Sequence, residues 1–209
     1  IWHFLLAGFF LVFLLNFRVW PISPPRPPVF EIYAIKDSGE NKKAVRTQAL
    51  LGLETKLEAK SAYVLDLKSG EVLLEKDSFF RRPLASLTKL LTVLIVEEQV
   101  KDDAFIPISL EAVRQDGDDK LRAGDALSKR DLIDFMLVAS SNDVAYAAAE
   151  YVGSLSGENS NGRVSRFVAM MNERAKELGL LDASFLNPHG LEQVINFREI
   201  PGAYGNAFD

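Results

Sequence analysis

Residues 81–98, with the sequence RRPLASLTKLLTVLIVEE, place a serine and a lysine at the start of a long apolar pattern. Apolar side chains recur there at the 3.6-residue spacing of a helix. Pro83 precedes the pattern, which predicts a helix over residues 86–99. The spacing is carried by Leu87, Leu90, Leu91, Leu94 and Ile95.

Ser86-Leu87-Thr88-Lys89 opens this helix, and positions i and i+3 of a helix lie on one face. The hydroxyl of Ser86 and the amine of Lys89 can therefore meet. A serine needs a base to become a nucleophile, and lysine qualifies only when it is neutral, a state that burial and nearby cations favour. The unpaired N–H groups at a helix start also suit an oxyanion. The alternative is a capping serine beside a solvated lysine.

A second polar group, Ser140-Ser141-Asn142, lies between two predicted helices. A hydroxyl and a carboxamide two residues apart can project from one short turn into the same cleft. The hydroxyl of Ser140 could relay a proton, and the amide of Asn142 could orient both a lysine and a substrate amide. The alternative is an ordinary helix junction, because serine and asparagine favour helix caps.

The order of elements indicates an α+β domain, because a hairpin comes first and a helical block follows. Two β-prone runs, 61–67 and 71–76, flank Lys68-Ser69-Gly70, which is typical of a hairpin turn. Further helices are predicted over 128–138, 143–152 and 164–178, the first opened by a capping-box sequence and the other two stopped by Gly153 and Gly179.

The N-terminal part has a different composition. Residues 4–15 are apolar and uncharged, and no small-x-small cleavage site follows them. We therefore expect residues 1–20 to be an uncleaved signal-anchor, a transmembrane helix; the alternative is a removed signal peptide. Residues 21–58, which begin PISPPRPP, are predicted to be a Pro-rich and polar linker, and residues 59–209 a globular domain.

Composition excludes several kinds of site. With 24 Lys+Arg against 29 Asp+Glu, the chain carries a net charge of −5, which argues against binding nucleic acid. It has no cysteine and only His3 and His189, so thiolate zinc sites and multi-histidine metal centres are not expected. The acidic residues 116–119 lack the ligand pattern of a calcium loop. We expect neither a metal nor an organic cofactor.

Ser-x-x-Lys followed by Ser-x-Asn is the signature of penicillin-binding proteins and serine β-lactamases. The flanking sequence resembles one branch, the low-molecular-mass D-alanyl-D-alanine carboxypeptidases of peptidase family S11. The resemblance covers about residues 59–209. It rests on SAYVLDLKSGEVLLEKD (61–77), RRPLASLTKLLTVLIVEE (81–98), VASSNDVAYAAAEYVG (138–153) and LNPHGLE (186–192).

The resemblance implies a β-lactamase/transpeptidase-like fold, in which helices cover the faces of a five-stranded antiparallel sheet. It also implies that Ser86 is the acylated nucleophile and Lys89 its general base. Ser140 would pass a proton to the departing D-alanine, and Asn142 would hold the substrate backbone. The implied substrate is a peptidoglycan pentapeptide ending in D-Ala-D-Ala, and β-lactam antibiotics would acylate Ser86. His189 has no necessary role in this scheme.

The family's third motif, Lys-Thr-Gly, does not occur after Asn142, and Lys68-Ser69-Gly70 matches its pattern only as a hairpin turn. We therefore expect the chain to be the N-terminal portion of such an enzyme, with the sheet incomplete at its C-terminus. The expected location is the bacterial cytoplasmic membrane, spanned once, with the catalytic domain outside the cytoplasm.

Two alternatives remain open. One is another enzyme of this fold, a β-lactamase or a peptidoglycan endopeptidase; Ser141 stands where class A β-lactamases usually have aspartate. The other is a non-catalytic, membrane-tethered cell-wall-binding protein that has lost the third motif. The intact residues Ser86, Lys89, Ser140 and Asn142 argue against that second alternative.

Overall fold

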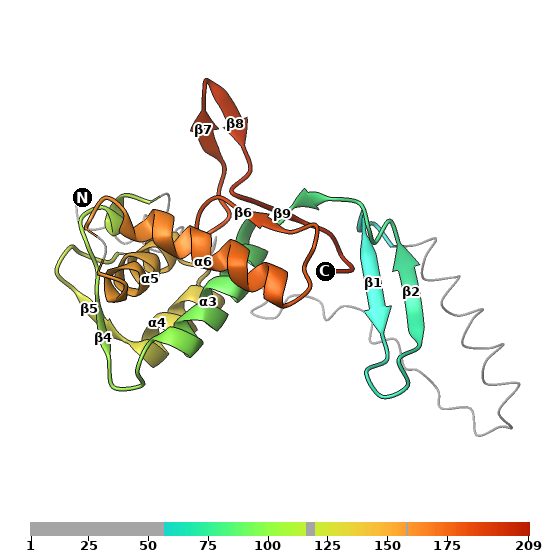
Figure 1. The fold of residues 1–209 in the computed structure, drawn as a ribbon, viewed down its shortest axis with the longest axis horizontal. Coiled ribbons are helices and arrows are strands. Elements are labelled where there is room, and N and C mark those ends of the chain that lie inside the picture. The colour runs from blue at the N-terminus through green and yellow to red at the C-terminus, as the bar shows by residue number, and fades with distance from the viewer. Residues whose placement is uncertain (1–56, 116–119, 158) are drawn as a thin grey trace, which may run out of the picture. The chain divides into compact units, whose positions relative to one another are not determined.

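The computed structural model describes residues 57–115, 120–157 and 159–209 (Figure 1). The expected membrane segment 1–20, nearly all of the expected linker 21–58 and the acidic residues 116–119 lie outside these ranges. Within the three ranges, no helix is both long enough and apolar enough to cross a membrane.

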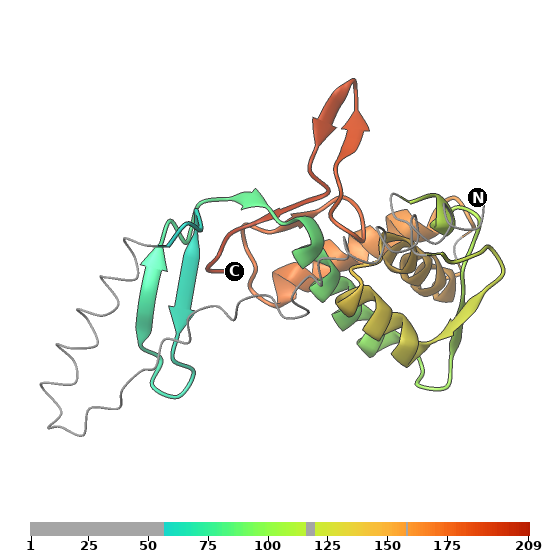
Figure 2. The same cartoon turned by 180° about the vertical axis from the view of Figure 1, so that it is seen from behind.

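Four α-helices of the described ranges pack around one apolar core, and opposite views show them side by side (Figures 1 and 2). The predicted helices are confirmed, with ends that agree to within three residues. Their bounds are α3 (Thr88–Gln99), α4 (Lys129–Val138), α5 (Asn142–Leu155) and α6 (Arg163–Glu177).

Helix α3 has two different faces. Its residues Leu91, Ile95 and Val96 are buried in the core. Leu90 of the same helix is 60% exposed, and Leu87, directly before the helix, is 63% exposed. A short 3-10 turn, η1 (Ala85–Leu87), precedes the helix, so Ser86 lies in this turn and not in the α-helix itself.

The start of α4 is fixed by the predicted cap. The Ser128 hydroxyl accepts a hydrogen bond from the Asp131 N–H at 3.1 Å and donates one to the Asp131 carboxylate at 2.7 Å. The next residue, Lys129, is buried and bonds to the carboxylates of Glu97 at 2.7 Å and Asp102 at 3.0 Å. These bonds tie the first residue of α4 to the end of α3.

Gly153 was predicted to stop α5, and this prediction is wrong, because the helix continues to Leu155. Instead, Gly153 allows α5 to pack closely against the start of α6. A Cβ atom at position 153 would lie 2.1 Å from the carbonyl oxygen of Arg163, the first residue of α6. The missing side chain therefore lets the backbones of α5 and α6 touch.

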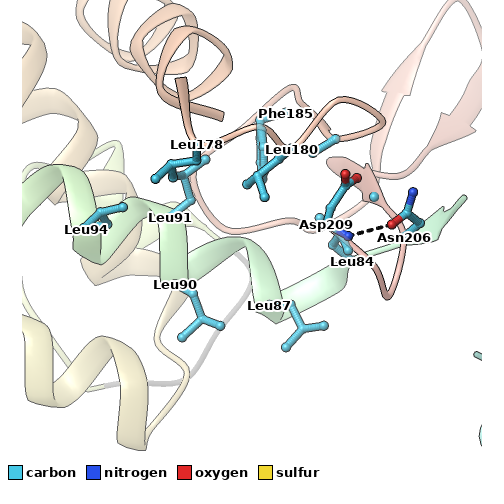
Figure 3. Close-up of a pocket in the computed structure, with 12 residues that line it drawn as sticks. Leu84, Leu87, Leu90, Leu91, Leu94, Leu178, Leu180, Phe185, Asn206 and Asp209 are labelled. Carbon is cyan, nitrogen blue, oxygen red and sulfur yellow. Dashed lines mark hydrogen bonds between the residues drawn. The ribbon is translucent and has the colours of Figure 1, made fainter. Parts of the chain in front are cut away.

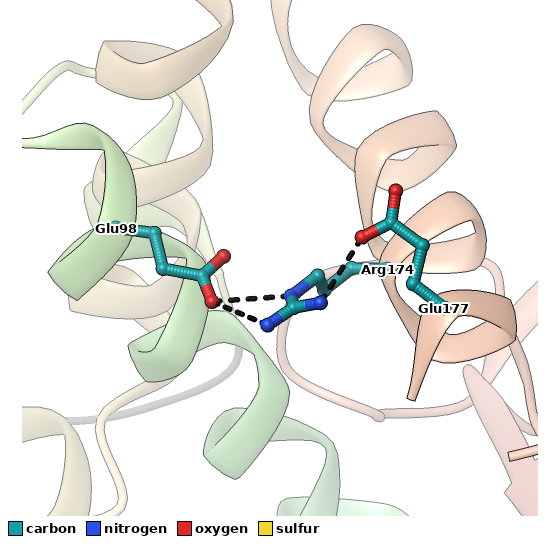
Figure 4. Close-up of polar contacts among 3 residues, drawn as sticks. All are labelled: Glu98, Arg174 and Glu177. Carbon is teal, nitrogen blue, oxygen red and sulfur yellow. Dashed lines mark hydrogen bonds and ion pairs between the residues drawn. The ribbon is translucent and has the colours of Figure 1, made fainter. Parts of the chain in front are cut away.

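Helix α6 ends at Glu177, and Gly179, the predicted stop signal, follows its C-cap Leu178 with a φ of +83°, the left-handed conformation that favours glycine. Near this end, Arg174 joins α6 to α3 (Figure 4). Its guanidinium donates to the Glu98 carboxylate at 2.8 and 3.1 Å and to Glu177 at 3.0 Å. This ion pair adds to the apolar core, to which both α3 and α6 contribute side chains.

The predicted hairpin is present as β1 (Ala62–Leu65) and β2 (Val72–Lys76), paired antiparallel. Lys68-Ser69-Gly70 lies in its turn, as predicted: the Gly70 N–H donates to the Asp66 carbonyl at 2.8 Å, and Gly70 has a φ of +71°. This tripeptide is therefore a turn and not a third catalytic motif.

The other strands of the described ranges are short. Within these ranges the strands form four separate small sheets, and the five-stranded sheet of the expected fold is not among them. A three-stranded sheet, in the order β3-β9-β6, flanks the start of η1, because the Leu84 N–H donates to the Ala203 carbonyl at 3.0 Å. The strands are β3 (Arg82–Pro83), β4 (Phe105–Pro107), β5 (Ala126–Ser128), β6 (Ser184–Phe185), β7 (Gln193–Ile195), β8 (Arg198–Ile200) and β9 (Ala203–Gly205), and a second 3-10 turn is η2 (Ala112–Arg114).

Candidate active site

Ser86 and Lys89 meet at the start of α3, as their spacing predicts. The side-chain nitrogen of Lys89 lies 3.1 Å from the Ser86 hydroxyl oxygen. Lys89 is only 2% exposed, whereas Ser86 is exposed. Neither η1 nor α3 has a side-chain cap, so the alternative of a capping serine beside a solvated lysine does not describe this pair.

Ser140, from the turn between α4 and α5, bonds to both Lys89 and Ser86. It follows α4 and has a φ of +57°, a left-handed backbone that few residues other than glycine adopt. Its hydroxyl accepts a hydrogen bond from Lys89 at 3.1 Å and donates one to the Ser86 hydroxyl at 3.0 Å. The three side chains thus form a closed triangle of hydrogen bonds.

The sharp turn after Ser140 leads directly into α5. Ser141 is buried and caps this helix, since its hydroxyl accepts a hydrogen bond from the Val144 N–H at 3.0 Å. Asn142 is the first residue of α5 and is half-buried. The alternative of an ordinary helix cap therefore describes Ser141. Ser140, by contrast, bonds to Lys89. Asp143 lies in the first turn of α5, where a negative charge interacts favourably with the positive end of the helix dipole.

The loop that contains His189 lies beside the triangle. His189 is buried, and burial together with the positive charge of Lys89 lowers the pKa of His189 to about 4. Its Nδ1 atom accepts a hydrogen bond from the Leu191 N–H at 3.2 Å, so this nitrogen carries no proton. That the catalytic scheme does not need His189 stays a prediction.

Two neighbours of the site were not predicted from the sequence. Thr92 is buried one turn after Thr88 and donates to the Pro188 carbonyl at 2.7 Å. Gly190 packs against the carbonyl of Ala85, the residue before Ser86. Pro188 and Gly190 on either side of His189 favour an ordered loop, but periodicity does not indicate which element such a loop contacts.

A separate pocket of about 290 Å³ is almost wholly apolar (Figure 3). None of the three triangle residues lines it. Its wall includes the exposed residues Leu87 of η1 and Leu90 of α3, so it continues the exposed face of that helix. The lining residues are Leu84, Leu87, Leu90, Leu91, Leu94, Leu178, Leu180, Ala183, Phe185, Gly205, Asn206 and Asp209.

A family model described as D-alanyl-D-alanine carboxypeptidase, peptidase S11, matches residues 44–205. The D-alanyl-D-alanine carboxypeptidase DacF of Bacillus subtilis is 33% identical over 158 residues, which is 73% of this chain and 37% of the Bacillus protein. A D-alanyl-D-alanine endopeptidase of Pseudomonas aeruginosa is 30% identical over 147 residues, covering 69% of this chain and 45% of that protein.

The solved structure of the D-alanyl-D-alanine carboxypeptidase DacD from Francisella tularensis is also similar. It superimposes with a TM-score of 0.61 at 33% identity, over 72% of this chain and 34% of the Francisella chain. The described part therefore has an α+β, β-lactamase/transpeptidase-like fold, as expected, but without the five-stranded sheet. The chain spans less than two fifths of the length of the Bacillus and Francisella proteins.

Proposed function

Because the chain belongs to the D-alanyl-D-alanine carboxypeptidase family, peptidase S11, we propose that the protein is a serine-type D-Ala-D-Ala carboxypeptidase. It would remove the terminal D-alanine from peptidoglycan stem peptides through an acyl-enzyme. The observation that carries the proposal is the buried Lys89 amine, which bridges the hydroxyl groups of Ser86 and Ser140.

In the acylation step, neutral Lys89 accepts the hydroxyl proton of Ser86, and Oγ attacks the carbonyl carbon of the last peptide bond. The oxyanion then collapses, the C–N bond breaks, and D-alanine leaves as an amine. The departing nitrogen receives its proton from Ser140, which Lys89 reprotonates. The 3.0 and 3.1 Å separations within the triangle suit both transfers without a further group.

In the deacylation step, water attacks the ester carbon, and the C–Oγ bond breaks. Lys89 takes a proton from the water and passes it to the departing Oγ, so that Ser86 regains its hydroxyl and Lys89 is neutral again. The solvent exposure of the two residues supports the proposal. Ser86 is exposed and so accessible to a substrate, whereas Lys89 is buried, and burial disfavours its charged form. Asn142 would hold the substrate backbone from the start of α5.

The test is acylation by a fluorescent penicillin, whose strained amide mimics the D-Ala-D-Ala bond. The protein is expressed at its natural length, and we expect covalent labelling that Ser86→Ala abolishes. Ser156→Ala is the matched control, because Ser156 is exposed at the end of α5, and it should label normally. Labelling that persists in Ser86→Ala would refute the assignment of the nucleophile.

A peptidoglycan endopeptidase is the second candidate, favoured by the similarity to the Pseudomonas endopeptidase. The two activities differ in their products. A carboxypeptidase releases free D-alanine from a pentapeptide, whereas an endopeptidase cleaves cross-linked dimers into monomers. Chromatography of both digests distinguishes them, and rapid hydrolysis of the penicillin itself would identify a β-lactamase instead.

We also propose that residues 1–20 anchor the protein in the bacterial cytoplasmic membrane, with the domain on the outer side. The support is the apolar, uncharged run 4–15 and the Pro-rich sequence that follows it, which is typical of a spacer. Fractionation tests the proposal: the protein should stay with membranes after a high-salt wash, and recovery in the soluble fraction would contradict it.

A further inference from the structure

We propose that Gly190 is a positioning residue for the nucleophile: it holds the peptide group between Ala85 and Ser86 in the orientation that the acylation step requires. This inference rests on the proposed function, because it concerns the same serine. It assigns a task to the loop at residues 187–191, which the catalytic scheme leaves without one.

The contact between the loop and the turn of Ser86 is direct. A Cβ atom at position 190 would lie 1.9 Å from the Ala85 carbonyl oxygen and 2.4 Å from the Thr88 hydroxyl. Gly190 has a φ of +82° and Ala85 a φ of +46°, so both backbones are left-handed where they meet. Only glycine fits against the Ala85 carbonyl at this distance.

The loop is itself held rigidly. The Asn187 side chain is buried; its oxygen accepts from the Gly190 N–H at 2.7 Å and its nitrogen donates to the Leu191 carbonyl at 2.8 Å. The Thr92 hydroxyl donates to the Pro188 carbonyl at 2.7 Å. The loop is thus fixed to the same helix whose first turn carries Lys89.

The position of the Ala85 carbonyl determines the direction of the Ser86 N–H. A peptide group is planar, and its C=O and N–H bonds point in opposite directions. Gly190 lies against the carbonyl side, so the Ser86 N–H points away from it. The N–H groups at a helix start suit a developing oxyanion, and such a donor acts only when it is aimed in advance. The Ala85 carbonyl accepts a hydrogen bond from the Thr88 N–H, and Gly190 leaves the room that this orientation of the peptide group needs.

The experiment compares Gly190→Ala with Gly179→Ala in the protein at its natural length. Gly179 has nearly the same backbone angle, a φ of +83°, but a Cβ atom there would meet nothing within 4 Å. Both variants therefore place alanine at nearly the same positive φ, and only Gly190→Ala displaces Ala85. The readouts are the first-order acylation constant for a fluorescent penicillin, the dissociation constant of the noncovalent complex, and the unfolding temperature.

We expect Gly190→Ala to lower the acylation constant by about 100-fold, the usual effect of losing one oxyanion donor, with little change in the dissociation constant. Gly179→Ala should acylate at nearly the original rate. Equal acylation constants in the two variants would overturn the inference while the proposed function stands. Failure of the unaltered protein to acylate would overturn the proposed function and the inference with it.

A second pair of variants covers the case in which Gly190→Ala does not fold. Thr92→Val keeps the shape of the side chain but removes the bond to Pro188, whereas Thr92→Ser keeps the hydroxyl. The inference requires at least about tenfold slower acylation in Thr92→Val, from a misaligned oxyanion donor, and recovery in Thr92→Ser. Acylation by Thr92→Val at the original rate would overturn it.

Discussion

The hydroxyl oxygens of Ser86 and Ser140 lie 3.0 Å apart, although 54 positions separate the two serines in the sequence. The same amine, that of Lys89, bonds to both. One serine belongs to the turn before α3 and the other to the turn before α5, so the packing of these two helices sets their distance. The proposed proton transfers depend on that packing.

Replacing Lys89 with alanine should remove the base and leave the helices folded. We expect acylation by a penicillin to slow by about 10² to 10⁴, the usual contribution of general base catalysis. Lys101→Ala is the control, because Lys101 is exposed and lies outside the triangle. Circular dichroism measures folding, and a time course of labelling measures acylation. Normal acylation in Lys89→Ala would remove the lysine from the mechanism.

At position 140, two substitutions separate the hydroxyl from the backbone. Ser140→Ala and Ser140→Gly both lose the hydroxyl, so both should slow acylation by about 10² or more. The φ of +57° costs an L-residue about 1–2 kcal/mol, part of which glycine recovers, so the glycine variant should be more stable by about 1 kcal/mol. Urea unfolding measures the difference, and equal activity in Ser140→Ala and the original protein would contradict the proton relay.

The stability of the domain should fall in mild acid because of His189. Its native pKa is about 4, against an ordinary 6.5, so between these pH values the unfolded chain binds more protons than the native one. Well above pH 6.5, His189 is neutral in both the native and the unfolded chain, so it adds no pH dependence to the free energy of unfolding. From pH 7 to pH 4.5 the linkage lowers stability by about 2–3 kcal/mol.

The matched variant is His189→Asn, which keeps an acceptor for the Leu191 N–H but cannot titrate. Urea unfolding at pH 7, 5.5 and 4.5 should give a smaller acid loss for this variant than for the original protein. Parallel pH dependences for the two proteins would show that His189 is not the group responsible.

Gly153→Ala should destabilise the domain, although alanine is normally about 1 kcal/mol better than glycine inside a helix. The added Cβ atom would lie 2.1 Å from the Arg163 carbonyl, a contact that forces α5 and α6 apart. Overpacking of this kind costs about 1–3 kcal/mol. Thermal and urea unfolding give the sign of the change, and a more stable variant would mean that the two helices do not touch as described.

When residues 57–209 are expressed alone, the exposed face of α3 should cause self-association. Leu87 and Leu90 are more than half exposed and border the apolar pocket. A contiguous apolar surface of this kind favours association. Light scattering should show less association after Leu87→Gln and Leu90→Gln together. Leu181→Gln is the control, since Leu181 is 83% exposed but does not line the pocket. A monomer with a cooperative, high-temperature unfolding transition would contradict the prediction.

Local patterns predicted the helices well, because caps and apolar periodicity depend on neighbouring residues. The bond between Ser128 and Asp131 and the turn at Gly179 are both examples. Gly153 shows the limit of such reasoning: in sequence, a glycine that ends a helix looks the same as one that lets two helices touch. Only the position of α6 separates the two cases.

One part of the candidate site could be predicted from neighbouring residues, and the other part could not. Ser86 and Lys89 are one helical turn apart, so their contact follows from local geometry. The approach of Ser140 came from the family resemblance, since no periodicity connects residues so far apart. Gly190 and Thr92 lie within stretches that carry the family resemblance, but the sequence assigned neither a role, because their contacts with the nucleophile turn and the loop appear only in three dimensions.

The left-handed backbones of Ala85 and Ser140 have a consequence for heat inactivation. Each costs about 1–2 kcal/mol, and only the surrounding packing maintains it. When warming loosens that packing, both residues can relax to ordinary angles while α3 to α6 remain helical. The temperature at which acylation is lost should therefore lie below the temperature at which the helical signal is lost, so that the reactive geometry is the most heat-sensitive property of this domain.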